Sequence, residues 1–422
     1  MKPTKPRVAI VGTGVAGLGC AWHLRETAAL TLFEKNARPG GHTNTVMVRE
    51  DGRDIPIDTG FIVFNHVTYP NLCLLFEELG VRTKPSEMSF SVQHLPSGLE
   101  YNGMSLNKVF AQRRNLLNPR FYRLLSDIFR FFRVANASLE SGVEGTVADF
   151  ARTHNLQGDF LEHYLVPMSS AVWSTDSRDI LHFPAETLIR FFHNHGFLGV
   201  STHHPWFTVD GGARTYMRKI LDQVGEPRLS AGISAVEAVG SAGRLHFEDG
   251  SREDFDAVVL ACHADEALAL LAAPTGLQKR LLSPFRYQPN HATLHTWAGV
   301  MPVRRRAWAS WNYRVDGVSS YPTTHYFMNA LQGVSRTGNY FVSLNSAGII
   351  PRENVLYETE YTHPVFTLDA IKAQAELPSI NTESRSQSIF FCGSYFKYGF
   401  HEDAYSAGLY LSTYLRERLT TP

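Results

Sequence analysis

The feature that most constrains this chain is a glycine motif between two short apolar runs near its start. Residues 8–11 have the length and composition of a buried parallel strand, and residues 30–33 form a second such run. Between the runs, three glycines follow the spacing G-x-G-x-x-G and lead into a helical repeat of apolar residues. This order predicts a βαβ unit that binds a dinucleotide at its glycine turn.

Each part of this unit has a physical role. The glycine loop contains Gly12, Gly14, Val15, Ala16 and Gly17. The first glycine allows the tight turn, the second lets a pyrophosphate approach the backbone, and the third lets the helix pack against the strand. The N-terminus of the helix offers free N–H groups to the phosphates. Glu34 follows the second run, where its carboxylate can accept hydrogen bonds from a ribose, and Lys35 comes next.

Two further glycine loops follow the βαβ unit. The first contains Arg38, Gly40, Gly41 and His42, close to the ribose end of the expected ligand. The second contains Gly60 and Phe61, directly after a predicted hairpin. A unit that binds NAD alone would not need these loops. A longer ligand that carries a flat ring system beyond its pyrophosphate would need them.

The composition is that of an ordinary globular enzyme. The length of 422 residues suggests two or three domains, and the formal net charge of zero argues against a nucleic-acid partner. The four cysteines have neither metal nor disulfide spacing, which suits a reducing compartment. Because we find no signal-peptide pattern and no apolar run long enough to cross a bilayer, we expect a cytoplasmic protein.

The alternation of strands and helices stops near residue 65 and returns after residue 205. We therefore predict an α/β fold with a discontinuous nucleotide-binding domain, formed by residues 1–65, 206–275 and 380–422. The second domain, an α+β substrate domain with a mostly antiparallel sheet, would comprise residues 66–205 and 276–379. The predicted helices include one capped by Thr68, one over 105–139, two over 161–171 and 185–195, and a last one from about Glu402.

Six segments together match a known family: the GTGVAG loop with its acid, ARPGGHTNT, DTGF, YPNL, RRAWASWNY and GFHEDAYSAG. On these segments the chain resembles, over nearly its whole length, the flavin-containing amine-oxidase superfamily of FAD oxidoreductases. It is similar in particular to a bacterial subgroup of predicted NAD/FAD-binding flavoproteins, and to the flavin domain fused to some plant cyclopropane fatty acid synthases. The resemblance implies a Rossmann-like FAD-binding domain of the GR2 type and non-covalently bound FAD.

The resemblance also assigns positions along the FAD. The glycine loop would hold the pyrophosphate, Glu34 the adenosine ribose, and residues 38–42 the path toward the flavin. Gly60 and Phe61 would contact the isoalloxazine ring, and Ile233 would clamp the adenine. The family usually has an arginine at the position that His42 takes here.

Near the C-terminus, Gly393 and Ser394 would meet the cofactor where the family commonly has a glycine followed by an acid. The backbone N–H near His401 would face the N1/C2=O edge of the flavin. A helix N-terminus at that edge stabilises the negative charge of a reduced flavin by about 0.3–2 kcal/mol. The lysine that holds a water near flavin N5 in many amine oxidases has no counterpart, because the comparable stretch is Arg304–Arg306.

Phe400 occupies the position where the family places one aromatic residue of a substrate cage, and Tyr395 and Trp311 are further predicted substrate contacts. Such a cage suits an amine and equally an apolar chain. We expect hydride transfer to or from flavin N5, with an unsaturated long-chain acyl lipid as the substrate. The reaction would be desaturation, saturation or double-bond isomerisation. Two alternatives stay open: an amine oxidase that uses oxygen, and a flavin-bound accessory subunit of a lipid-modifying enzyme complex.

The sequence predicts no metal site and assigns no catalytic base. His193 and His195 stand two residues apart, where side chains on a helix do not face one ligand. The chain has no G-x-S-x-G motif, so a hydrolase is not expected. The polar residues within 358–363 could serve as acids or bases, but a solvated surface explains them equally well.

The segment Lys108–Arg133 suggests peripheral contact with an anionic membrane, at its inner face. It contains seven basic residues and a single acid, Asp127. Basic residues near an anionic leaflet contribute about 1 kcal/mol each. One stripe of the predicted helix is apolar and consists of Leu117, Phe121, Leu124, Ile128 and Phe131. The alternative is that this stripe packs on the substrate domain, with the arginines as its solvated face.

Overall fold

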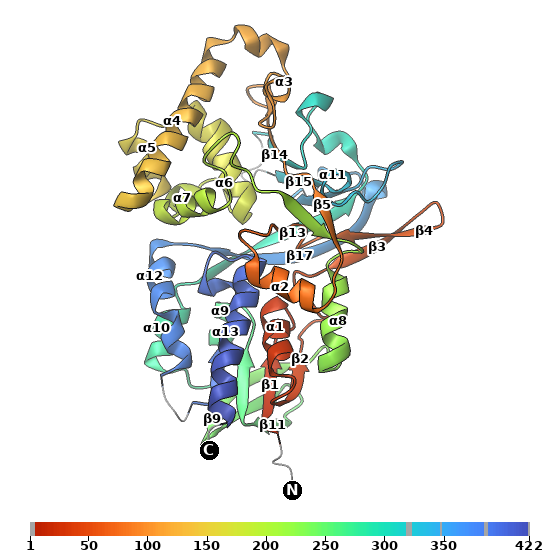
Figure 1. Cartoon of the computed structure of the whole chain (residues 1–422), viewed down its shortest axis with the longest axis vertical. Helices are drawn as coiled ribbons and strands as arrows, with labels where there is room; N and C mark the ends of the chain where they lie inside the picture. Colours follow the sequence, from red (N-terminus) through yellow and green to blue (C-terminus); the bar gives the residue numbers. More distant parts are fainter. Residues whose placement is uncertain (1–4, 318–322, 347, 384–386, 421–422) are drawn as a thin grey trace.

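A four-stranded parallel sheet forms the core of one half of the molecule (Figure 1). The computed structural model describes residues 5–317, 323–346, 348–383 and 387–420. The strands come from three separate parts of the chain, and their order across the sheet is Ile389–Phe391 (β18), Ala257–Leu260 (β12), Arg7–Val11 (β1) and Ala29–Phe33 (β2).

The predicted βαβ unit is confirmed. β1 and β2 pair in parallel, and helix α1 (Val15–Leu24) connects them. The C-terminal helix α13 (His401–Thr420) packs along α1 (Figure 1). The two helices approach closely, because a Cβ at Gly408 would lie 2.2 Å from the carbonyl oxygen of Ala16.

Smaller sheets complete this half. An antiparallel meander of three strands contains Ile233–Val239 (β9), Ala242–Phe247 (β10) and Arg252–Phe255 (β11). The predicted hairpin is confirmed as Thr45–Glu50 (β3) and Arg53–Asp58 (β4). Helix α8 (Arg214–Val224) packs against α1 in this half.

A seven-stranded sheet forms the other half. Its strand order is Val355–Val365 (β17), Arg286–His295 (β13), Phe341–Leu344 (β16), Thr323–Phe327 (β15), Trp311–Val315 (β14), Phe90–His94 (β6) and Leu99–Asn102 (β7). All of its pairings are antiparallel except that of β14 with β6. The predicted, mostly antiparallel sheet is thus confirmed. A short pair, Thr83–Ser86 (β5) and Trp206–Val209 (β8), links it to the helices.

The helices of this half surround one end of the seven-stranded sheet (Figure 1). They include Pro70–Glu78 (α2), Leu106–Val109 (α3), Pro119–Ser141 (α4), Val147–Thr153 (α5), Val166–Trp173 (α6) and Ala185–Asn194 (α7). Met328–Gln332 (α11) also lies in this half, whereas Ala264–Leu270 (α9), Gly276–Leu282 (α10) and Leu368–Glu376 (α12) lie beside α13 (Figure 1). None of the helices in the described part of the chain has the length and apolar character that a membrane span requires.

Two predicted helix boundaries are wrong. The helix predicted over 105–139 is broken, because Asn118 adopts an extended conformation before Pro119 and its side chain caps α4 instead. The residue at the N-cap of α2 is Tyr69, not Thr68. The Thr68 backbone N–H and hydroxyl are held by Asn65, in a turn that precedes the helix.

Candidate functional site

One cavity of about 1370 Å³ extends from the carboxyl ends of β1 and β2 into the half that contains the seven-stranded sheet. All of the predicted cofactor and substrate residues line it, except Gly17 and Gly40. The cavity therefore brings together residues from both ends of the chain and from its middle.

The glycine loop has the geometry that a pyrophosphate requires. Gly12 has a φ of +105°, and a Cβ at Gly17 would lie 2.0 Å from the carbonyl oxygen of Gly12. These two positions therefore accept glycine only. A Cβ at Gly14, in contrast, would have no heavy atom within 4 Å. The N-terminus of α1 also lacks a side-chain cap, so that its N–H groups are available to phosphate oxygens.

The carboxylate of Glu34 braces this loop. It is buried and accepts hydrogen bonds from Thr13 N (3.1 Å) and Oγ1 (2.6 Å), and from Asn36 N (3.0 Å) and Nδ2 (2.8 Å). These four bonds use the lone-pair sites of both oxygens. A ribose hydroxyl at Glu34, which stays a prediction, would therefore have to replace the Thr13 hydroxyl or the Asn36 amide. The neighbouring Lys35 pairs with Glu266.

The second glycine loop closes over the first. The Arg38 guanidinium donates to the carbonyl oxygen of Gly41 (3.0 Å), and the Gly40 N–H donates to the carbonyl oxygen of Thr13 (3.2 Å). A Cβ at Gly41 would lie 3.3 Å from the Cα of Gly14. The two loops thus form one cradle, with Gly40 behind it rather than on the cavity wall.

His42 does not replace the charge of the family arginine. Its ring stacks on Tyr361 with the centroids 4.8 Å apart, and His363 lies at 5.2 Å. Burial lowers the pKa of His42 well below its usual value, so the imidazole is neutral. Strand β17 also contributes to the site, because the hydroxyl of its Tyr361 lies 2.7 Å from the Thr59 hydroxyl, one residue before Gly60. Sequence reasoning missed this contact, because the polar residues of the segment are typical of a solvated surface.

His401 begins α13, one residue before the predicted start. Its ring stacks on Phe61 with the centroids 3.8 Å apart, and its Nε2 lies 2.6 Å from the Tyr216 hydroxyl. Burial lowers the pKa of His401 to about 3, so this imidazole is also neutral. The Glu402 carboxylate points away to α2, where it accepts from Leu72 N (2.9 Å). The start of α13 therefore borders the cavity, and the Glu402 carboxylate braces another helix.

Phe400 lies against a wall of rings from α6 and α7. Its ring stacks on Phe191 at 4.8 Å, and the rings of Trp173 and His195 both lie 6.2 Å away. His195 in turn stacks on Trp206 at 6.2 Å. Burial lowers the pKa of His195 to about 4, so the wall carries no charge. These neighbours provide the aromatic surroundings that the predicted role of Phe400 requires.

Sequence reasoning missed this wall, because its rings lie on separate elements. The only signal is the spacing of Phe191 and His195, which are four residues apart and share one face of the chain at the end of α7. The Nδ1 of His195 bonds the carbonyl oxygen of Phe191 (2.9 Å), which fixes the ring against its neighbour.

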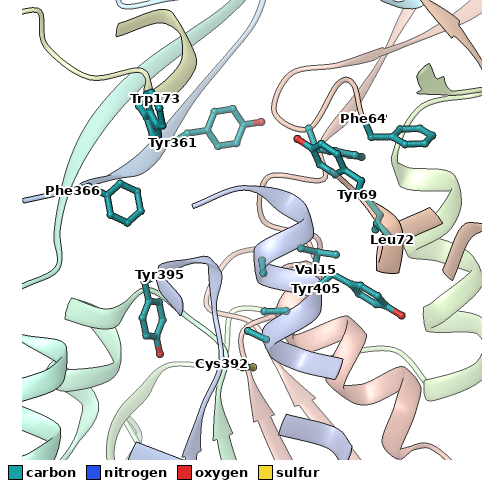
Figure 2. Close-up of a cluster of buried hydrophobic side chains, with 14 of the residues drawn as sticks. Val15, Phe64, Tyr69, Leu72, Trp173, Tyr361, Phe366, Cys392, Tyr395 and Tyr405 are labelled. Atoms are coloured by element: carbon teal, nitrogen blue, oxygen red, sulfur yellow. The ribbon is translucent and has the colours of Figure 1, made fainter. Parts of the chain in front are cut away.

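The other predicted substrate contacts line different parts of the cavity. Tyr395 packs on Phe285 at 5.5 Å and lies apart from Trp173 (Figure 2). Trp311, on β14, meets Tyr326 edge-on at 5.0 Å. The predicted cofactor contacts Ile233, Gly393 and Ser394 lie at the start of β9 and just after β18.

Comparison with known proteins points to one family. The family model described as flavin containing amine oxidoreductase matches residues 15–296, which is more than half of the chain. A search of curated sequences finds no significant match.

Solved structures share the fold over the full length. Cyclohexylamine oxidase from Brevibacterium oxydans IH-35A has a TM-score of 0.70 at 16% identity, covering 99% of this chain and 100% of that chain. The CLA-producing fatty acid isomerase from P. acnes has a TM-score of 0.68 at 13% identity, covering 97% and 98%. A putrescine oxidase bound to putrescine has a TM-score of 0.69 at 14% identity, covering 98% and 99%. At these identities the likeness establishes the fold alone, and the predicted fold class is confirmed.

Proposed function

This chain belongs to the family of flavin-containing amine oxidoreductases, and we propose that it acts on an unsaturated long-chain acyl group. It is an FAD-dependent oxidoreductase. When bound, FAD supplies hydride transfer at the flavin N5. The residues of this chain bind and orient the cofactor and the substrate, and they exclude water from the contact between them.

The observation that carries the proposal is the chemical character of the cavity around Phe400. The acids that line the cavity are Glu34, Glu266 and Glu360. Glu34 and Glu266 lie at the glycine cradle, and Glu360 adjoins Tyr361, whose ring stacks on His42. Among the described residues, none of these three carboxylates lies at the aromatic wall. The carboxylate next to the wall, Asp403, accepts a hydrogen bond from the backbone N–H of Phe400 (3.0 Å) and does not line the cavity, so it is not placed to pair with an ammonium group there. An acyl chain needs no such partner, because it is held by apolar contact.

Two neutral histidines support the same conclusion. Burial lowers the pKa of His195 to about 4 and that of His401 to about 3. Neither is therefore charged at neutral pH, so neither offers a charge to a substrate in the cavity. Phe400 and Phe191 would hold a flat, unsaturated part of the chain in a fixed orientation. Desaturation, saturation and double-bond isomerisation all require that orientation.

Two other functions are outcomes of the same test. An amine oxidase would use the aromatic wall as a cage for an amine. A flavin-bound accessory subunit of a lipid-modifying complex would hold the cofactor without turning over either class of compound.

The test mixes the protein anaerobically with oleic acid, linoleic acid, cyclohexylamine and putrescine, once with oxidised and once with chemically reduced FAD, while the flavin absorbance is followed and the double bonds of the recovered acids are located. We expect a response to the unsaturated acids and none to the amines. Desaturation reduces the oxidised flavin, saturation oxidises the reduced flavin, and isomerisation moves a double bond without a net change in the flavin. The variant Phe400→Leu should weaken that response at least about tenfold. Tyr410→Leu is the matched control, because this exposed ring on α13 lies outside the cavity lining. Bleaching by amines alone would overturn the proposal in favour of amine oxidation. No response to any compound would favour the accessory role.

A further inference from the structure

The tip of the molecule that contains α3 and the start of α4 exposes a cluster of large apolar side chains. This tip lies at the end far from both termini (Figure 1). Leu117 is 90% exposed and Leu106 is 78% exposed. The other exposed apolar residues in this part of the chain are Met104, Leu116, Tyr122 and Phe129. Exposed apolar side chains gathered in one part of a surface are typical of an interaction site.

These residues are not the stripe that the sequence predicts for membrane contact. Of that stripe, four residues are buried against the neighbouring helices: Phe121, Leu124, Ile128 and Phe131. Phe131, for example, meets the rings of Phe150 and Phe192. The alternative prediction, packing of the stripe in the interior, is therefore correct, and only Leu117 of the stripe faces outward. The exposed residues occupy the turns before α4 and its outer face.

The exposed cluster continues into the cavity. Met104, Leu106 and Phe129 are exposed, and each also lines the cavity that contains Phe400. Val200 has the same two properties. An apolar chain that leaves the cavity at this point therefore meets an apolar outer surface instead of water.

The same tip is positively charged, although the whole chain has no net charge. Residues 101–126 contain five basic residues and no acid. Arg120 pairs with Asp159, and Lys108 lies 3.9 Å from Glu87. In the part of the chain that the structure describes, Arg113, Arg114 and Arg123 form no ion pair and are exposed.

A shallow groove joins the two properties at one place. Its lining includes Leu116, Leu117 and Tyr122 together with Arg123. Apolar side chains flanked by arginines are the composition of surfaces that lie in the interface of an anionic bilayer. There the apolar groups enter the acyl boundary and the guanidinium groups meet lipid phosphates.

We propose that this tip, defined by the exposed residues of 104–129, docks on anionic phospholipid membranes and opens the cavity to the bilayer. The charge of the tip indicates the occupant, because an anionic surface complements the three arginines that form no ion pair, whereas an uncharged or basic partner does not. That an acyl chain then enters the cavity rests on the proposed function. The docking itself does not.

The test is co-sedimentation with vesicles of phosphatidylglycerol and phosphatidylcholine, and with vesicles of phosphatidylcholine alone. We expect binding to the anionic vesicles only, reduced by salt. The double variant Leu116→Asp/Leu117→Asp should bind at least about tenfold more weakly, and Arg113→Gln/Arg123→Gln should lose the preference for anionic lipid. Leu74→Asp on α2 is the matched control, because Leu74 is also exposed but lies outside the tip. Retained flavin absorbance shows that each variant is folded.

Three results would overturn the proposal. They are no binding to anionic vesicles, equal binding by wild type and the Leu116/Leu117 variant, and self-association that this variant abolishes, which would assign the tip to a second copy of the chain. Failure of the proposed function is distinguishable, because vesicle binding is measured without turnover. Binding without conversion of any lipid would leave the docking intact and remove only the acyl substrate.

Discussion

Substituting two glycines of the same loop should have opposite effects on folding and on cofactor binding. In Gly17→Ala the new Cβ would lie 2.0 Å from the carbonyl oxygen of Gly12 and 3.2 Å from the Cβ of Ala261. The helix must shift away from β1, which costs about 1–3 kcal/mol or more as overpacking. The gain in helix propensity is only about 1 kcal/mol. The apoprotein should therefore be clearly less stable.

In Gly14→Val the new side chain enters open space. Gly14 has φ −65° and ψ 174°, which any L-residue can adopt, and a Cβ there would have no neighbour within 4 Å. The loss of a favourable N-cap residue and the gain from a stiffer unfolded chain are each about 1 kcal/mol and of opposite sign. The stability of the apoprotein should thus stay within about 1 kcal/mol, whereas the side chain fills the space that the pyrophosphate needs.

The assay has two readouts on the same samples. Urea unfolding of the apoprotein, followed by circular dichroism, gives the free energy of unfolding. Titration with FAD, followed by quenching of flavin fluorescence, gives the dissociation constant. For Gly14→Val we expect wild-type stability and FAD binding weakened at least about a hundredfold, or about 2.7 kcal/mol. A Gly14→Val variant that binds FAD normally, or a Gly17→Ala variant of unchanged stability, would refute the reasoning about this loop.

Three further predictions follow from the structure. FAD should be bound non-covalently, so acid precipitation should leave the yellow colour in the supernatant; colour in the pellet would contradict this. Burial raises the pKa of Asp58 to about 6, so its contribution to stability is present at low pH and is lost as the pH rises through 6. In urea unfolding, wild type should therefore gain stability relative to Asp58→Asn as the pH falls from 7 to 4. A difference between the two proteins that does not change with pH would contradict this. The Asn118 side chain accepts from Arg120 N at the start of α4, so Asn118→Ala should cost about 0.5–2 kcal/mol of unfolding free energy, and no loss would show that the cap is unimportant.

The elements that the sequence predicts well are those with local determinants. The strand, glycine turn, helix and second strand between Arg7 and Phe33 are all determined by neighbouring residues, and each has the expected place. Local determinants also stabilise the start of α5, where Thr146 and Asp149 form a capping box. In these cases the residue that stabilises the element lies within a few positions of it.

One error had a local signal that was outweighed. The apolar periodicity over 105–139 is helical on both sides of Asn118, and it predicts one long helix. The dipeptide Asn118–Pro119 is a turn signal, because a proline disfavours the helical conformation of the residue before it. The break places the turns before α4 at the surface and thereby exposes Leu117.

The aromatic wall could not be predicted in this way. Trp173 and Phe191 lie on α6 and α7, and only the tertiary packing brings their rings to Phe400. Trp206 on β8 joins the wall through His195. The same is true of Tyr361, which reaches the cofactor loops from β17. Sequence patterns report the faces of single elements, whereas these contacts depend on how separate elements meet.

The most direct test of the central claim is the structure of the product. The FAD-loaded enzyme is incubated with linoleic acid, with and without a reductant, and the recovered lipid is examined by mass spectrometry for the number and position of its double bonds. The account predicts a chain with a double bond moved, added or removed, and much less of it with Phe400→Leu than with Tyr410→Leu. Recovery of unchanged acyl chains from the FAD-loaded enzyme, together with conversion of an amine to its aldehyde or ketone, would contradict it.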